Sequence, residues 1–124
     1  MTAPRPLLPI LAVTLPSAVF GFCLTAVLAW GKAEPVAVVN QSGREFDRKA
    51  ITVTSGEAVR FTNEDPFLHQ IYVDSPAFSF DSTEQMPGNS VDVTFTTPGV
   101  FQVRCGIHPR MRLDVTVVKP SVQH

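Results

Sequence analysis

The strongest constraint in this sequence is an alternation of apolar and polar residues that recurs in short runs from Val36 to Val118. Successive side chains of a β-strand point to opposite faces, so a period of two indicates strands that bury one face. Residues typical of turns separate the runs. The pattern predicts seven strands, at residues 36–39, 49–54, 57–62, 69–74, 90–95, 100–105 and 112–118.

Short strands separated by turns are typical of an all-β fold, and we expect an antiparallel Greek-key β-sandwich or flattened barrel of about seven to eight strands. Ser55-Gly56 indicates a two-residue hairpin connection. Residues 75–89 are the least patterned segment and predict an irregular strand or a short helix. The predicted core consists of the alternating apolar residues Ile51, Val53, Val59, Phe61, Ile71, Val73, Val91, Val93, Phe95, Phe101, Val103, Leu113, Val115 and Val117.

The first 33 residues form a hydrophobic leader that differs from the rest of the chain. Arg5 precedes a stretch without charge, residues 7–30, and small residues follow it. This order is typical of a secretory signal peptide. We expect cleavage after Ala33, which leaves a domain of residues 34–124. If the leader is not cleaved, its apolar stretch is long enough to anchor the chain in a bilayer, which needs about 20 residues. In both cases residues 34–124 are exported.

Charge and cysteine content exclude several classes of protein. Ten Lys and Arg oppose eleven Asp and Glu, which gives a formal net charge of −1 and argues against nucleic-acid binding. The two cysteines, Cys23 and Cys105, are too few for a disulfide-stapled domain or a Cys-rich zinc module. Cleavage of the leader leaves Cys105 alone in an oxidising compartment. It is then either a buried free thiol or a thiolate bound to a metal.

A compact loop, Cys105-Gly106-Ile107-His108-Pro109-Arg110-Met111, carries three residues that bind soft or borderline metals. The two-residue period places Cys105, Met111 and the distant His69 on the buried faces of their strands, at strand ends. His108 lies in the loop between Cys105 and Met111. These four side chains are therefore expected to meet at one end of the sandwich.

One thiolate, two imidazoles and a thioether are the donors of a blue-copper electron-transfer site. Structural zinc rarely accepts methionine, and iron–sulfur clusters need more cysteines. A nucleophilic Cys–His pair leaves Met111 without a role. Because four protein side chains fill the site, no position remains for a substrate. The pattern therefore favours a carrier over an enzyme.

The segment 43–118 resembles a small cupredoxin of the plastocyanin and amicyanin type. The resemblance rests on residues in the order expected for that family: Gly56, Asn63, His69, Pro87-Gly88, Val93-Thr94-Phe95, Gly99 and Cys105-x-x-His108-Pro109-x-Met111. It implies one copper ion that cycles between Cu(I) and Cu(II). His69, Cys105 and His108 would be its equatorial ligands and Met111 its axial ligand. The short loop from Cys105 to Met111 is most similar to that of amicyanin.

Three residues next to the ligands follow from the same resemblance. Asn63 comes before the first ligand loop, and Pro109 directly follows the second histidine ligand. Gln70 stands where cupredoxins usually carry an asparagine that hydrogen-bonds between the two ligand loops. The two-residue period points Gln70 away from His69, so we expect this bond to be absent.

Cupredoxins expose the edge of the second histidine inside an apolar patch, through which electrons enter and leave. The corresponding candidates here are Pro66, Phe67 and Leu68, with core packing as an equal alternative for Phe67 and Leu68. Arg110 would lie at the rim of the patch and steer the protein toward an acidic partner. Rim charges of this kind act mainly on the association rate.

The sequence thus predicts an exported, periplasmic, mononuclear type 1 copper protein that carries single electrons between redox partners. By resemblance alone, the donor would be an amine dehydrogenase and the acceptor a c-type cytochrome. The alternative is a periplasmic copper-binding or delivery protein, which would share every ligand. A plain adhesion sandwich is a third reading, but it treats four matching ligand positions as chance.

Overall fold

The computed structural model describes residues 2, 32 and 34–122, so the predicted leader lies outside the described residues except for residues 2 and 32. The described part of the chain forms nine strands and no helix: β1 Ala37–Ser42, β2 Glu45–Phe46, β3 Ala50–Thr54, β4 Ala58–Asn63, β5 Tyr72–Val73, β6 Phe80–Asp81, β7 Ser90–Thr94, β8 Gly99–Arg104 and β9 Arg112–Val118. None of these described residues belongs to a helix long and apolar enough to cross a bilayer.

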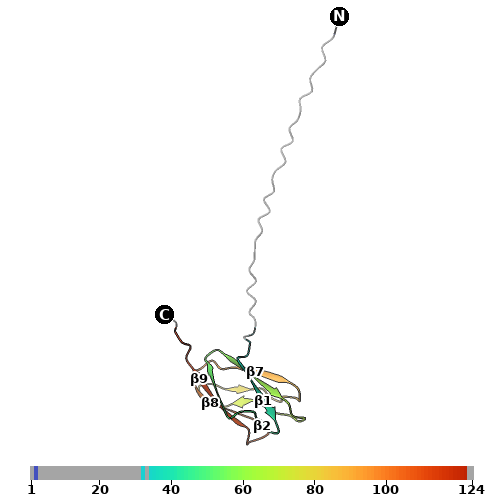
Figure 1. The fold of residues 1–124 in the computed structure, drawn as a ribbon, viewed down its shortest axis with the longest axis vertical. Helices are drawn as coiled ribbons and strands as arrows, with labels where there is room; N and C mark the ends of the chain where they lie inside the picture. Colours follow the sequence, from blue (N-terminus) through green and yellow to red (C-terminus); the bar gives the residue numbers. More distant parts are fainter. Residues whose placement is uncertain (1, 3–31, 33, 123–124) are drawn as a thin grey trace. The chain divides into compact units, whose positions relative to one another are not determined.

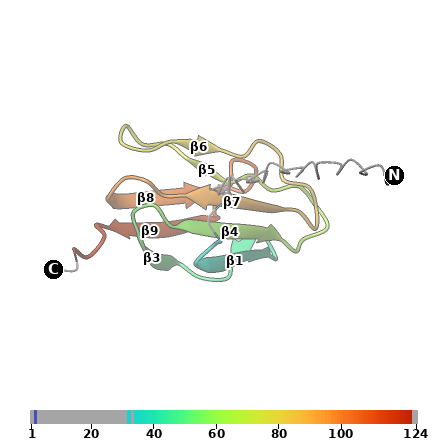
Figure 2. The ribbon, with the colours of Figure 1, turned by 90° about the horizontal axis from the view of Figure 1, so that it is seen from above.

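The strands form two sheets, in the orders β2-β1-β4-β7 and β3-β9-β8-β5-β6 (Figures 1 and 2). The predicted all-β sandwich is confirmed. The pairing is mixed rather than purely antiparallel, because β1 runs parallel to β4 and β3 runs parallel to β9. The two strands beyond the predicted seven, β2 and β6, each contain two residues and are too short to produce a periodic signal.

The hairpin predicted at Ser55-Gly56 is wrong, because β3 and β4 belong to different sheets. The Ser55 amide donates to Val118 O at 2.8 Å, and the Gly56 amide donates to Phe95 O at 2.7 Å. These two bonds tie the turn to one strand end in each sheet. Gly56 has a φ of 96°, a conformation that side chains disfavour. The dipeptide is therefore a corner through which the chain crosses the sandwich.

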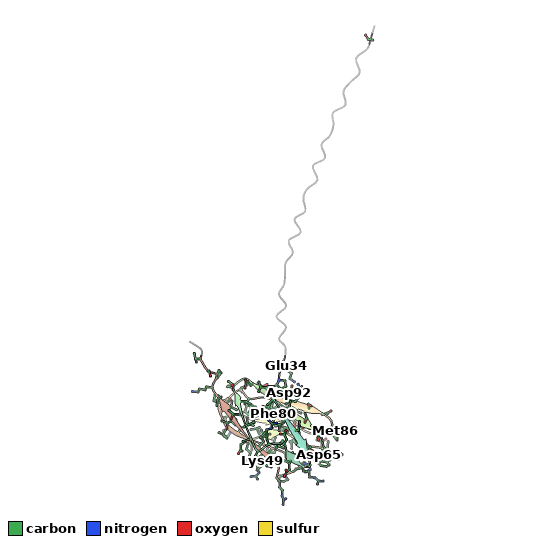
Figure 3. The ribbon with its side chains drawn as sticks, viewed as in Figure 1. Glu34, Lys49, Asp65, Phe80, Met86 and Asp92 are labelled. Carbon is green, nitrogen blue, oxygen red and sulfur yellow. The ribbon has the colours of Figure 1, made fainter. Side chains whose placement is uncertain are left out.

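The core lies between the sheets and contains the residues that the alternation predicts. Most of them are buried, while Ile51 and Val91 are half-buried against the others. Phe61 and Phe95 are the largest fully buried side chains, and each contributes about 1.5–3 kcal/mol by its removal from water. Phe80 of β6, labelled in Figure 3, packs against the edge of this core. The sandwich is thus a stiff support for the loops at its ends.

The strand predicted at residues 69–74 is shorter than expected, since only Tyr72 and Val73 form β5. His69 instead makes a single bridge to Gln85, in which each amide donates to the other residue's carbonyl at 3.0 and 2.8 Å. Within residues 75–89, the regular structure consists of β6 and of Gln85, the partner of His69 in the bridge, and no helix forms there. The bridge fixes the backbone of His69 where its side chain enters the core.

Candidate metal centre

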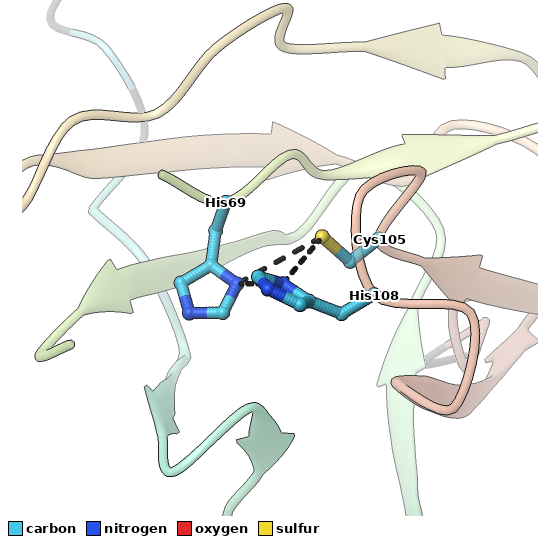
Figure 4. Close-up of side chains that lie close together, drawn as sticks. All are labelled: His69, Cys105 and His108. Atoms are coloured by element: carbon cyan, nitrogen blue, oxygen red, sulfur yellow. Dashed lines mark hydrogen bonds between the residues drawn. The ribbon is translucent and has the colours of Figure 1, made fainter. Parts of the chain in front are cut away.

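Three of the predicted ligands meet at one place, although they come from separate parts of the chain. His69 precedes β5, Cys105 directly follows β8, and His108 lies in the loop that leads to β9. Figure 4 shows their side chains pointing toward one another. His69 is 0% exposed and Cys105 is 2% exposed, whereas His108 is half-buried. One donor of the cluster therefore reaches toward the surface.

The three donor atoms form a nearly equilateral triangle. Cys105 Sγ lies 3.8 Å from His69 Nδ1 and 3.7 Å from His108 Nδ1, and the two nitrogens are 3.2 Å apart. The centroid of this triangle lies about 2.3 Å from the sulfur and about 2.0 Å from each nitrogen, which are the usual lengths of metal–thiolate and metal–imidazole bonds. A single metal ion fits among these atoms.

The orientation of the His69 ring is set by Asp65. Asp65 Oδ2 lies 2.8 Å from His69 Nε2. Since a carboxylate only accepts, Nε2 carries a hydrogen, and the tautomer that this selects for a neutral ring has its lone pair on Nδ1. That lone pair faces Cys105 and His108. The hydrogen bond thus prepares His69 as a ligand.

Two pKa shifts agree with this assignment. Burial would raise the pKa of Asp65, but hydrogen bonds from the Arg44 amide, the His69 ring and the Gly43 amide hold it below its ordinary value. Burial lowers the pKa of His108, and the nearby His69 and Arg44 lower it further against the opposing effect of Asp65. At neutral pH the His108 ring is therefore neutral and able to donate a lone pair to a metal.

Met111 is 1% exposed and directly precedes β9, whose Leu113 and Val115 are also buried. Its backbone amide donates to His108 O at 2.9 Å, which closes a tight turn through Pro109 and Arg110. The turn brings the backbone of Met111, the predicted fourth ligand, back toward that of His108. The role of Met111 as the axial ligand stays a prediction.

Asn63 ties the ligand loop of His69 together from inside. Its Nδ2 donates to Phe67 O at 2.9 Å and to Gln85 O at 3.0 Å, and its Oδ1 accepts from the Asp65 amide at 3.0 Å. The side chain therefore spans the loop that carries both Asp65 and His69.

Gln70, which stands where cupredoxins usually carry an asparagine, donates its side-chain hydrogen bond to β6. Its Nε2 donates to Asp81 Oδ1 at 2.7 Å, and its Oε1 packs so closely on Gly106 that a Cβ there would overlap it. Gln70 thus connects β6 to the residue that follows Cys105, by packing on one side and a hydrogen bond on the other. Pro109 is exposed in the turn after His108.

The four candidates for partner docking differ in their surroundings. Phe67 is half-buried, and its ring centroid lies 5.5 Å from that of His69 and 5.5 Å from that of His108. Leu68 is also half-buried, while Pro66 and Arg110 are exposed. Phe67 is thus neither a fully buried core residue nor a fully exposed one, because its ring packs against the two histidine rings while remaining partly accessible to solvent.

A groove of about 380 Å³ opens beside His108 and is lined by Gly43, Arg44, Glu45, Ile107, His108, Pro109 and Arg110. The Arg44 guanidinium lies 4.7 Å from the centroid of the Phe67 ring, within cation–π distance. Sequence reasoning missed Arg44, Ile107 and Asp65. For Asp65 a signal existed, since a metal-binding histidine usually donates its second N–H to a carboxylate or carbonyl, and Asp65 is four residues from His69.

A buried cysteine sulfur with two imidazoles is a soft and borderline donor set that suits copper, and the triangle fits a single type 1 copper ion. The comparisons with known proteins agree with this chemistry. Residues 34–118 match the model of the family described as copper binding proteins, plastocyanin/azurin family. Plastocyanin of Ulva arasakii is 33% identical in an alignment of 81 residues that covers 58% of this chain and 83% of the plastocyanin. Amicyanin-alpha of Methylorubrum extorquens is 28% identical over 116 residues, covering 86% of this chain and 98% of the relative.

Solved structures have the same fold. A Cu-containing nitrite reductase (NirK) from Thermus scotoductus SA-01 superposes with a TM-score of 0.64 at 28% identity, over 73% of this chain and 24% of the reductase chain. This chain therefore spans about a quarter of that enzyme's length. An amicyanin variant in its Cu(I) form superposes with a TM-score of 0.61 at 20% identity, over 65% of this chain and 80% of the amicyanin.

Proposed function

Because the chain belongs to the plastocyanin/azurin family of copper-binding proteins, we propose that it carries single electrons between redox partners through one type 1 copper ion. In this proposal His69, Cys105 and His108 are the equatorial ligands and Met111 is the axial ligand. The bound ion supplies the one-electron couple between Cu(I) and Cu(II). No ligand position is left for a substrate, so the protein acts as a carrier rather than an enzyme.

The observation that carries the proposal is the triangle of donor atoms held by stiff elements. Cys105 is fixed by β8, and His69 by its bridge to Gln85. His108 is held by the turn that its carbonyl closes with the Met111 amide. A site held by stiff elements changes little in geometry when the electron arrives or leaves, and this favours fast transfer.

The route of the electron would run through His108, the one donor that is not fully buried. The groove beside it carries Arg44 and Arg110, and no acid other than Glu45 lines it. We infer that the partner presents an acidic surface, which these arginines attract and orient. By resemblance, an amine dehydrogenase as donor and a c-type cytochrome as acceptor fit this role.

We also propose that residues 1–33 are an export leader and that residues 34–124 are the copper domain, active in the periplasm or another exported location. The charge-free apolar stretch at residues 7–30, which follows Arg5 and precedes small residues, supports this division. Recovery of an exported form that begins near Glu34, measured by mass spectrometry, is the expected result. A form that keeps residues 1–33 in the membrane fraction would instead support an uncleaved anchor.

Copper delivery would use the same ligands, so the experiment must separate the two roles. We expect the copper-loaded chain to give one reversible one-electron wave in voltammetry. It should also retain its copper through repeated reduction in the presence of a Cu(I) chelator. Quantitative loss of copper to the chelator on the first reduction would overturn the carrier role and favour delivery.

A further inference from the structure

The buried carboxylate of Asp65 accepts hydrogen bonds from residues outside its own loop as well as from His69. The residue is 7% exposed, and three N–H groups point at its two oxygens. Gly43 N donates to Oδ1 at 2.7 Å, Arg44 N donates to Oδ2 at 3.0 Å, and His69 Nε2 lies 2.8 Å from Oδ2. The carboxylate therefore joins the ring of a copper ligand to the turn between β1 and β2.

This turn is shaped to receive an anion. Gly43 and Arg44 both have positive φ, 63° and 60°, as a tight two-residue hairpin between Ser42 and Glu45 requires. Arginine is unfavourable in this conformation, where glycine or asparagine is usual. Successive backbone N–H groups of such a turn form a concave anion-binding site, and here they hold Asp65.

The charge of Asp65 has no permanent cation beside it. Among the described residues, the ion pair that Asp65 forms within 4.0 Å is with His69, which is neutral as a copper ligand. The Arg44 side chain turns instead toward the Phe67 ring. In the loaded protein, the copper centre would be a positive charge that faces this carboxylate across a single imidazole.

We propose that Asp65 is a positioning residue of the copper site with two effects. It fixes the hydrogen of His69 on Nε2, which leaves Nδ1 free to bind the metal. Its negative charge stabilises Cu(II) more than Cu(I), because the oxidised ion carries one more positive charge. The inference rests on the proposed copper ligands, but it does not depend on which partners exchange electrons.

The variant Asp65→Asn tests the charge at nearly constant volume. Its amide oxygen can still accept from the Arg44 amide and His69 Nε2, but its NH2 group then faces the Gly43 amide, which loses its acceptor. We expect the affinity of the full chain for Cu(II) to fall about 10–100-fold, as for other partners of metal-binding histidines. The affinity for Cu(I) should fall clearly less. The reduction potential then rises by about 59 mV for each tenfold change in the ratio of the two affinities.

Two further variants separate charge from structure. Asp92→Asn removes another largely buried carboxylate, which pairs with Arg60 at 2.7 Å and lies apart from Asp65 in Figure 3. It should leave the ratio of Cu(II) to Cu(I) affinity unchanged. Asp65→Glu keeps the charge and should return the potential toward that of the wild type.

A measurement on the wild type keeps the inference testable even if Asp65→Asn does not fold. In the metal-free protein, long-range ¹H–¹⁵N correlations should assign the hydrogen of the neutral His69 ring to Nε2, as a slowly exchanging resonance, because Asp65 alone then selects the tautomer. A His69 hydrogen on Nδ1 would overturn the inference. An unchanged ratio of copper affinities in Asp65→Asn, with only the apo protein destabilised, would also overturn it. A wild-type chain that binds no copper would refute the proposed function itself.

Discussion

The hydrogen bonds of the Asn63 side chain should contribute strongly to the free energy of unfolding, because they hold the ligand loop together. The variant Asn63→Ala measures this contribution. Asn63 is 1% exposed and joins Phe67 O, Gln85 O and the Asp65 amide. Alanine leaves Phe67 O and the Asp65 amide without these partners, whereas Gln85 O keeps the His69 amide. A buried group that loses its hydrogen bond costs about 1–3 kcal/mol, so the two together cost about 2–6 kcal/mol. Water that enters the space left by the side chain can bond to some of these groups and reduce the cost. We therefore expect the free energy of unfolding to fall by about 2–4 kcal/mol.

The assay is urea unfolding of the metal-free full chain, in which the midpoint should fall while the slope stays constant. Asn40→Ala is the matched control, because the half-buried Asn40 only accepts from the Thr62 hydroxyl on the neighbouring strand, at 2.9 Å. That hydroxyl can turn to other acceptors, so the control should lose about 1 kcal/mol or less. Equal losses in the two variants would refute the reasoning that the Asn63 bonds hold the loop.

Three other predictions concern the axial ligand, the surface charge and the response to pH. Met111→Leu should keep the blue colour and shift the reduction potential, measured by voltammetry; loss of all thiolate absorption would show that Met111 does more than fill an axial position. Arg110→Glu should slow association with an acidic redox partner at low salt and leave dissociation almost unchanged, measured by stopped flow; a rate independent of ionic strength in both proteins would contradict steering. The hydrogen bond from Arg60 lowers the pKa of Asp92, so this pair stabilises the fold above about pH 4 and stops doing so as the pH falls through the lowered pKa. Asp92→Asn should therefore be less stable than the wild type at pH 7 and equally stable near pH 2 in chemical unfolding, and a difference that persists in acid would refute the charge pairing.

The strands with strong alternation could be predicted from the sequence because one face of each is buried. The run at 112–118 matches β9 residue for residue, and its Leu113, Val115 and Val117 are buried. The same period correctly placed His69, Cys105 and Met111 inside. Local pattern could not show which strands pair, since Ser55-Gly56 fits a hairpin and a corner equally well. The difference lies in hydrogen bonds to Val118 and Phe95, which are distant in the sequence.

The predicted ligands could be found in the sequence because their combination of residue types is rare. The residues that contact these ligands, such as Asp65, could not be found in this way. A thiolate, an imidazole and a thioether within seven residues, together with the upstream His69, have few explanations, so the four residues together indicated copper. Asp65 is one of eleven acidic residues, and only the fold brings it against His69 and the turn at Gly43. The direction of the Gln70 side chain followed from parity, but its contact with Gly106 depends on how two loops approach each other.

The central claim is that Cys105, His69 and His108 hold one copper ion as a thiolate complex. The most direct measurement is titration of the full chain with Cu(II), followed by visible absorption. One equivalent should produce an intense blue thiolate-to-copper charge-transfer band, which Cys105→Ser abolishes and Cu(I) formation bleaches. A protein that takes up copper without this band, or that keeps the band in Cys105→Ser, would contradict the account.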